Sequence, residues 1–280
     1  MRTQIDFRFS LFRHFSVRPE QLDVERIDIL HSDRAGRSLD EIEEIPTLRW
    51  LQSRPELLEL LLGQVGLSGH VCSDVQVTQP FLPRNKRGDI DLIAIPAEEP
   101  RCAVAFQAKR FKVKVDGDDE RVSLDAEKLT ALVRQCNETI SLGFHQVYGL
   151  VLVMIDGQNK EVRSLIHRGT SERTFKRIYR FFKQGSLDPR AGVVFVEIIQ
   201  PTPADPAELG MMAVGVDQWA SKAEQASRLS EKVAKFAEKL RRKGNITSVQ
   251  LPPLEGMSPI PVSPIEEIGL RLVNKGSELR

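Results

Sequence analysis

The alternation of apolar and polar residues along the chain predicts an α/β protein. Apolar runs rich in Val, Ile, Ala and Phe predict three consecutive strands, at 70–81, 89–95 and 103–113. Apolar residues then recur at helical spacing from about 125 to 142, which predicts a helix with one face on a core. The nearly continuous apolar run 146–155 is typical of a strand in the middle of a sheet.

The segment before these strands has a helical pattern. Pro46 and Pro55 divide residues 38–66, because proline starts or ends a helix more readily than it continues one. Ser53 is a candidate N-cap for the second of the two helices. The expected order is therefore helix, three strands, helix, strand, which we write αβββαβ, with a mixed central sheet.

The remaining segments predict additions to this core. Residues 5–11 alternate like a strand, and the polar stretch 116–120 is expected to be a loop. Further along, a basic helix is expected at 171–184, a strand at 192–200 and a long helix at 217–243. The expected organisation is an N-terminal β-rich extension (1–37), a main domain (38–206), a C-terminal helix (207–250) and a proline-rich tail (251–280).

Composition sets broad limits on function. A net charge of +1 means that any affinity for nucleic acid must come from local clusters of charge. The three cysteines are widely spaced, which favours a reducing cytoplasm over a disulfide framework or a zinc site. No apolar run approaches the ~18 residues of a membrane span. The chain has neither a Walker A loop nor a GxGxxG motif, so nucleotide hydrolysis and dinucleotide binding have no support.

Polar side chains stand out in two of the expected strands. Asp89 and Asp91 open the second strand, and Gln107 and Lys109 lie in the third. Residues two apart in a strand share a face, so an antiparallel hairpin could bring the two pairs together. Carboxylate and amide oxygens beside an ammonium group suit a divalent metal that acts on phosphate.

The order of elements, with Asp91 on the second strand and the motif Phe106-Gln-Ala-Lys-Arg-Phe111 on the third, resembles the PD-(D/E)xK nuclease superfamily. The Gln-x-Lys spacing resembles the Mrr-like branch of this superfamily. The resemblance covers about 50–156. It implies a restriction-endonuclease-like fold in which Asp91 and Gln107 hold Mg²⁺ or Mn²⁺. Lys109 would orient the attacking water or stabilise charge on the phosphate. The implied function is an endonuclease for DNA, with RNA still open, in defence against foreign DNA.

The resemblance leaves the remaining metal ligands open. Gln107 is neutral where relatives of this type often carry glutamate, so another carboxylate is expected to supply charge. Asp89 is one candidate, and a glutamate of the first core helix, Glu56 or Glu59, is another. Glu56 and Glu59 also fit a solvated helix face, and Asp91 with Lys109 also fits a simple cross-strand ion pair.

Basic residues that could contact a nucleic-acid backbone flank the site and recur in the expected basic helix. They are Arg84, Lys86, Arg87, Arg110, Lys112, Arg173, Lys176, Arg177 and Arg180. One alternative function is a catalytically inactive nuclease fold that binds nucleic acid. Another is a subunit of a larger complex, in which the helix at 217–243 and the proline-rich tail are docking elements, and the helix could also form a homodimer.

Overall fold

The structure is a computed structural model of the 280-residue chain. It describes residues 13–17, 43–82, 88–116, 119–123, 126–155, 178, 180–182, 185–199 and 210–250. The expected strand at 5–11, most of the basic helix at 171–184 and the proline-rich tail lie outside these residues.

The described strands form one mixed sheet in the order β1–β8–β7–β6–β4–β3–β2–β9, while β5 pairs only with β4. Their bounds are β1 (Arg13–Val17), β2 (Gly69–Val77), β3 (Ile90–Pro96), β4 (Val104–Asp116), β5 (Asp119–Ser123), β6 (Gln146–Ile155), β7 (Gly192–Ile199), β8 (Gly210–Gln218) and β9 (Ile246–Val249). The pairs β4–β6 and β6–β7 are parallel, and the other pairs are antiparallel. β4 therefore joins the antiparallel and parallel parts of the sheet.

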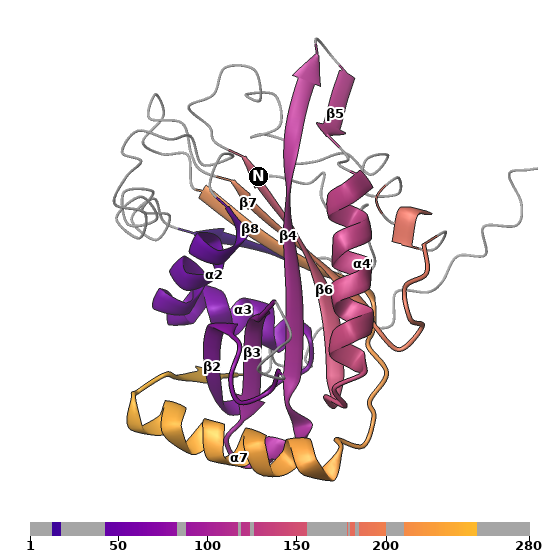
Figure 1. Cartoon of the computed structure of the whole chain (residues 1–280). Helices are drawn as coiled ribbons and strands as arrows, with labels where there is room; N and C mark the ends of the chain where they lie inside the picture. Colours follow the sequence, from indigo (N-terminus) through magenta and orange to yellow (C-terminus); the bar gives the residue numbers. More distant parts are fainter. Residues whose placement is uncertain are drawn as a thin grey trace, which may run out of the picture.

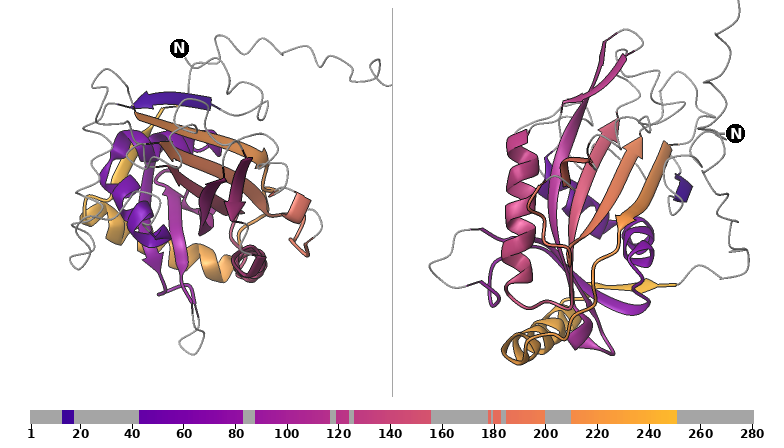
Figure 2. Two further views of the ribbon diagram at one scale, coloured as in Figure 1. Left: turned by 90° about the horizontal axis from the view of Figure 1, so that it is seen from above. Right: turned by 90° about the vertical axis from the view of Figure 1, so that its right-hand side faces the viewer.

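Helices cover both faces of the sheet (Figures 1 and 2). α2 (Glu44–Ser53) and α3 (Pro55–Gln64) pack on one face, where Trp50, Leu57 and Phe106 belong to one apolar cluster. α4 (Ala126–Ile140) and α7 (Ser227–Arg242) contribute to a second cluster on the other face. α4 also provides the long crossover that the parallel pair β4–β6 requires.

β4 is long because it has two partners in succession. Its first part, Val104–Phe111, pairs with β6, and its last part, Lys112–Asp116, pairs with β5. In Figure 1 this end of β4 and β5 stand beyond the rest of the sheet as a two-stranded hairpin. The expectation of a polar loop at 116–120 was therefore wrong for Asp116, Asp119 and Glu120, which belong to paired strands. Positions 117–118 lie outside the described residues.

The expected helix, three strands, helix and strand are present in this order as α3, β2, β3, β4, α4 and β6, with the additional strand β5 between β4 and α4. Two further details differ. Pro46 lies within α2, in the first turn, where backbone N–H groups have no intrahelical acceptor and proline is tolerated. Ser53 is not an N-cap: it ends α2, and its hydroxyl donates to the carbonyl of Trp50 at 2.7 Å.

The C-terminal part was predicted incorrectly. Residues 210–218 form β8 rather than the start of a helix, and α7 begins at Ser227. β8 and β9 belong to the central sheet, so residues 207–250 are not only a helical extension. The apolar side of α7, including Val233, Phe236 and Leu240, is buried in the chain's own core. A partner protein would meet only the charged side of this helix. None of the described helices is long and apolar enough to cross a bilayer.

Candidate active site

The candidate site lies where the hydrogen-bond ladder between β3 and β4 ends. The two strands pair from Ala94 with Val104 to Leu92 with Phe106. One position further, the backbone N–H of Ala108 donates to Oδ2 of Asp91 at 2.6 Å. A side-chain carboxylate therefore takes the role that a backbone carbonyl has in the rest of the ladder.

Burial disfavours the ionised form of the Asp91 carboxyl group. Only 3% of the residue is exposed, and burial is the main cause that raises its pKa from 3.8 to about 6. The Ala108 amide and the charge of Lys109 lower the pKa, whereas the charges of Asp89 and Glu44 raise it. Since these partners compensate burial only in part, a cation beside Asp91 would stabilise its ionised form.

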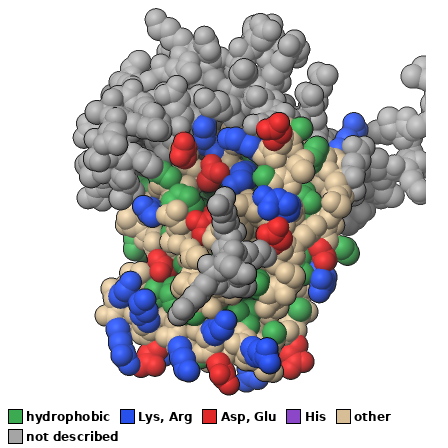
Figure 3. Space-filling view, viewed as in Figure 1, with side chains coloured by type: hydrophobic (Ala, Val, Ile, Leu, Met, Phe, Trp, Pro, Cys, Tyr) green, Lys and Arg blue, Asp and Glu red, His purple; other side chains and the backbone are tan. Residues whose placement is uncertain are grey.

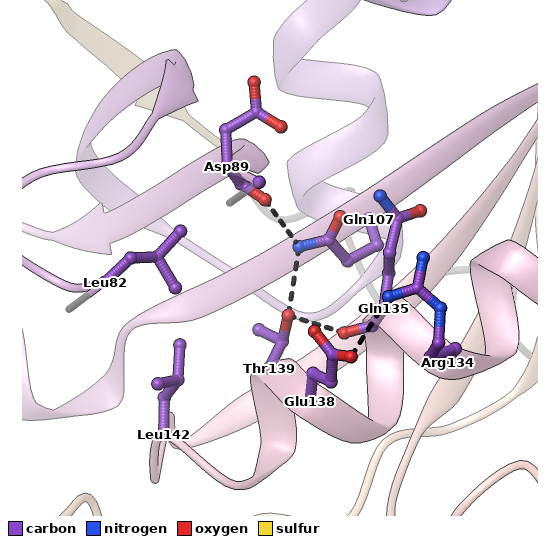
Figure 4. A pocket seen from close by; sticks show the side chains of 9 residues that line it. Leu82, Asp89, Gln107, Arg134, Gln135, Glu138, Thr139 and Leu142 are labelled. Carbon is purple, nitrogen blue, oxygen red and sulfur yellow. Dashed lines mark hydrogen bonds and ion pairs between the residues drawn. The ribbon is translucent and has the colours of Figure 1, made fainter. Parts of the chain in front are cut away.

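Gln107 has one end of its amide bonded and the other end without a partner. Its Nε2 donates to the carbonyl of Asp89 at 3.1 Å and to Oγ1 of Thr139 at 3.0 Å (Figure 4). The Asp89 carbonyl can only accept, so the nitrogen must face it. Oε1 of Gln107 is buried and accepts no hydrogen bond from the described residues. The fold thus fixes the Gln107 amide with its oxygen buried and without a described hydrogen-bond partner.

Lys109 forms an ion pair with a glutamate that the sequence pattern did not single out. Its Nζ lies 3.0 Å from Oε1 of Glu44, and the two side chains are 15% and 21% exposed. Glu44 begins α2, where the helix dipole favours an acidic side chain. The only sequence signal for it was its place immediately before the Ile45-Pro46 start of a helical pattern.

The other acidic residues that the sequence singled out as metal ligands have different surroundings. The carboxylate of Glu59 accepts a hydrogen bond from the backbone of Gln250 at 2.8 Å, and Glu56 is exposed. The charges of Asp89 and Glu44 raise the pKa of Asp91, whereas Glu56 and Glu59 are not among the groups that shift it. In Figure 4 the Asp89 carboxylate points away from Gln107, while its backbone carbonyl points toward it. The structure therefore brings Asp91, Lys109 and Glu44 close enough for their charges to interact. Gln107 lies on the neighbouring strand, one position beyond the last ladder pair, and its amide contacts Asp89 and Thr139.

A pocket of about 240 Å³ opens beside Gln107, between α4 and the start of β3. Gln135 and Thr139 of α4 line one side, and Leu82 and Leu142 line another (Figure 4). The Thr139 hydroxyl donates to the backbone carbonyl of Gln135 at 2.8 Å, which fixes the acceptor for Gln107.

The predicted nucleic-acid contacts are described only in part. Arg84, Lys86, Arg87, Arg173, Lys176 and Arg177 lie outside the described residues, and Lys112 is described by its backbone alone. Arg180 is exposed. Arg110 is only 5% exposed, so its guanidinium does not lie on the surface. Figure 3 shows Lys and Arg side chains on the surface along α7, mixed with acidic ones.

Among the described residues, no group of three or more His, Cys, Asp or Glu side chains is placed to hold a metal ion. The candidate metal ligands are the carboxylates of Asp91 and Glu44 and the amide oxygen of Gln107. Comparisons with protein-family models, curated proteins and solved structures found no match for this chain. The described fold and site define an α/β protein with a buried acidic and amide centre at a break in its sheet.

Proposed function

We propose that the protein is a metal-dependent endonuclease with a restriction-endonuclease-like core, acting on DNA. One observation carries the proposal: a buried carboxylate, Asp91, and an unpartnered buried amide oxygen, that of Gln107, flank the same ladder break. The αβββαβ order of elements and the Gln-x-Lys spacing on β4 support it, since both agree with the PD-(D/E)xK resemblance. A role in defence against foreign DNA, in the cytoplasm, is part of this proposal.

The residues present fit a hard divalent cation. Mg²⁺ prefers oxygen ligands, and the centre offers carboxylates and an amide oxygen that lacks a described partner. Asp91, Gln107 and Glu44 would hold the ion, with Mn²⁺ as an alternative. When bound, Mg²⁺ would lower the pKa of a water molecule and neutralise charge on the phosphate.

The chain's own residues hold this centre in place. Ala108 fixes the Asp91 carboxylate through its backbone N–H. Thr139 and the Asp89 carbonyl fix the orientation of the Gln107 amide. Glu44 holds the ammonium group of Lys109, which is nearly buried and can donate hydrogen bonds to a phosphate oxygen or to the attacking water.

A cleavage assay tests the proposal. Plasmid DNA and single-stranded DNA are incubated with the protein and Mg²⁺, Mn²⁺ or EDTA. We expect metal-dependent cleavage that Lys109→Met lowers by about 10²–10³-fold, the usual effect of removing one group that stabilises transition-state charge. Lys222→Met, on the exposed segment between β8 and α7, is the matched control and should cleave like wild type. Equal cleavage by both variants would refute the assignment of the site.

A second function deserves a test because Gln107 is neutral and Lys109 is already paired with Glu44. The chain would then be an inactive nuclease fold that binds nucleic acid. Its signature is retained binding to DNA or RNA, measured by fluorescence anisotropy, with no cleavage of either in Mg²⁺ or Mn²⁺.

A further inference from the structure

Five cations form a single line along α7. Arg228, Lys232, Lys235, Lys239 and Arg242 are all exposed, and successive members are four, three, four and three residues apart. At about 100° of rotation per residue, this spacing places all five within an arc of about 80° around the helix axis. At about 1.5 Å per residue, the line is about 21 Å long. We call these five residues the basic stripe.

The acidic side chains of α7 do not interrupt the basic stripe. Glu231 and Glu238 are seven residues apart, so they lie together along one side of it. Glu238 pairs with Arg242, whereas the other four cations of the stripe form no ion pair with any described residue. Figure 3 shows Lys and Arg side chains along this edge of the molecule, over α7. Most of the positive charge of the stripe is therefore available to an external anion.

The stability of α7 does not explain the basic stripe. The helix dipole favours cations in the last turn, which accounts for Lys239 and Arg242. Arg228, by contrast, lies in the first turn, where the dipole favours acidic side chains and this helix has none. Like charges three and four residues apart also repel one another on a helix surface. Because the stripe works against the local stability of the helix, its charge pattern points to an external partner.

The exposed side of α7 offers charge without apolar surface. Val233, Phe236 and Leu240 are buried in the chain's own core, and Ala234 is the one apolar residue that this helix exposes. A protein interface usually has an apolar centre that is poor in lysine. A helix that lies on an anionic membrane buries an apolar face in it. A nucleic-acid backbone needs no apolar contact, because Lys and Arg neutralise its phosphates at the surface.

We propose that the basic stripe binds the phosphate backbone of duplex DNA outside the cleavage centre, without regard to sequence. This inference rests on the proposed nuclease function, which makes DNA the partner. The length of about 21 Å covers the rise of about six nucleotides of one strand, at roughly 3.4 Å each. The stripe is therefore long enough to contact several consecutive phosphates.

The place of α7 in the fold suits this role. The helix lies across the end of the molecule where β4 begins and packs against Pro100–Cys102, just before that strand (Figure 1). Arg241 also donates a hydrogen bond to the carbonyl of Ala97, which holds α7 against the sheet. Lys109 is five residues from the start of β4, or about 17 Å along the strand. That distance is about half a turn of duplex, so one DNA molecule can meet both the stripe and the centre.

The salt dependence of DNA binding tests the stripe without cleavage. A fluorescent duplex of about 20 base pairs is titrated with the full-length protein in EDTA at several KCl concentrations, and binding is followed by anisotropy. Each phosphate contact contributes about 0.9 to the slope of log K against log salt concentration. The triple variant Lys232→Gln, Lys235→Gln, Lys239→Gln should have a slope that is shallower by about 2–3. It should bind about 10²-fold more weakly near 0.1 M salt.

The matched control removes three exposed cations outside the stripe, as Arg101→Gln, Arg190→Gln, Lys222→Gln. It changes the net charge by the same amount and should keep the wild-type slope. Glu231→Gln removes an acidic side chain beside the stripe and should strengthen binding about twofold or more. A gain of this kind cannot result from misfolding.

An unchanged slope in the triple variant, or an equal loss of binding in the control, would overturn the inference. So would a triple variant that binds DNA like wild type but no longer binds phosphatidylserine vesicles, because the partner would then be a membrane. If the slopes change as expected and no DNA is cleaved, the nuclease proposal fails and the stripe stands. Cleavage by the wild type with an unchanged slope in the triple variant has the opposite meaning.

Discussion

Replacing Asp91 by asparagine should make the metal-free protein more stable at neutral pH. Asparagine has nearly the same shape and keeps an oxygen that can accept the hydrogen bond from Ala108. It removes only the charge that burial disfavours. The prediction therefore separates the energetics of the charge from those of packing.

The expected size follows from the pKa of Asp91. The rise from 3.8 to about 6 corresponds to about 3 kcal/mol, since each pKa unit equals about 1.4 kcal/mol. Because the folded state binds the proton more tightly, the contribution of Asp91 to stability is full below pH 3.8 and is lost as the pH rises through about 6. The advantage of Asp91→Asn should be small near pH 3.8 and approach about 3 kcal/mol above pH 7.

Urea unfolding in EDTA, measured from pH 4 to pH 8 for wild type and Asp91→Asn, checks the reasoning. The difference in unfolding free energy should grow with pH across this range. With Mg²⁺ added, only the wild type should gain stability, since its carboxylate holds the ion. A difference that is independent of pH, or a variant that is less stable at pH 8, would refute the account of Asp91 as an undercompensated buried anion.

The remaining predictions concern the metal, α2 and the sheet. At Mg²⁺ concentrations well below saturation, cleavage should rise with pH through about 6, because Asp91 must be ionised to hold the ion; a rate that stays flat down to pH 5 under these conditions would contradict this. Glu44→Gln should reduce the rise in melting temperature that Mg²⁺ produces, measured by scanning calorimetry, and an unchanged rise would remove Glu44 from the ligand set. Gly192→Ala should destabilise the protein by about 1–3 kcal/mol in urea, because its Cβ would overlap the ring of Tyr148. Gly63→Ala, whose Cβ would have no neighbour closer than 3.8 Å, is the control and should not destabilise.

The core elements were predictable because each has a clear period. β6 follows the nearly continuous apolar run 146–155, and α4 follows apolar spacing of helical type. β8 was missed because Pro201, Pro203 and Pro206 obscure the boundary before it. Its glycines, Gly210 and Gly215, also weaken the strand pattern.

The site was only partly predictable for a different reason. Asp91, Gln107 and Lys109 belong to a hairpin, so local pairing rules could place them together. Glu44 reaches Lys109 across 65 positions of sequence, and nothing in a local pattern encodes that contact. Arg110 could have been excluded from a role beside Lys109, because neighbouring residues of a strand point to opposite faces.

The length of β4 fixes a distance as well as a shape. Lys109 and Asp116 belong to one uninterrupted strand, so about 23 Å separate the centre from the hairpin tip, at about 3.3 Å per residue. That span equals about seven nucleotides of one strand of duplex DNA at roughly 3.4 Å each. A backbone touched at the tip would meet the centre a set number of nucleotides away. The length of β4 would then set the distance between this contact and the cleaved bond. Adding two residues to β4 and two to β5 would move the cut by about two nucleotides.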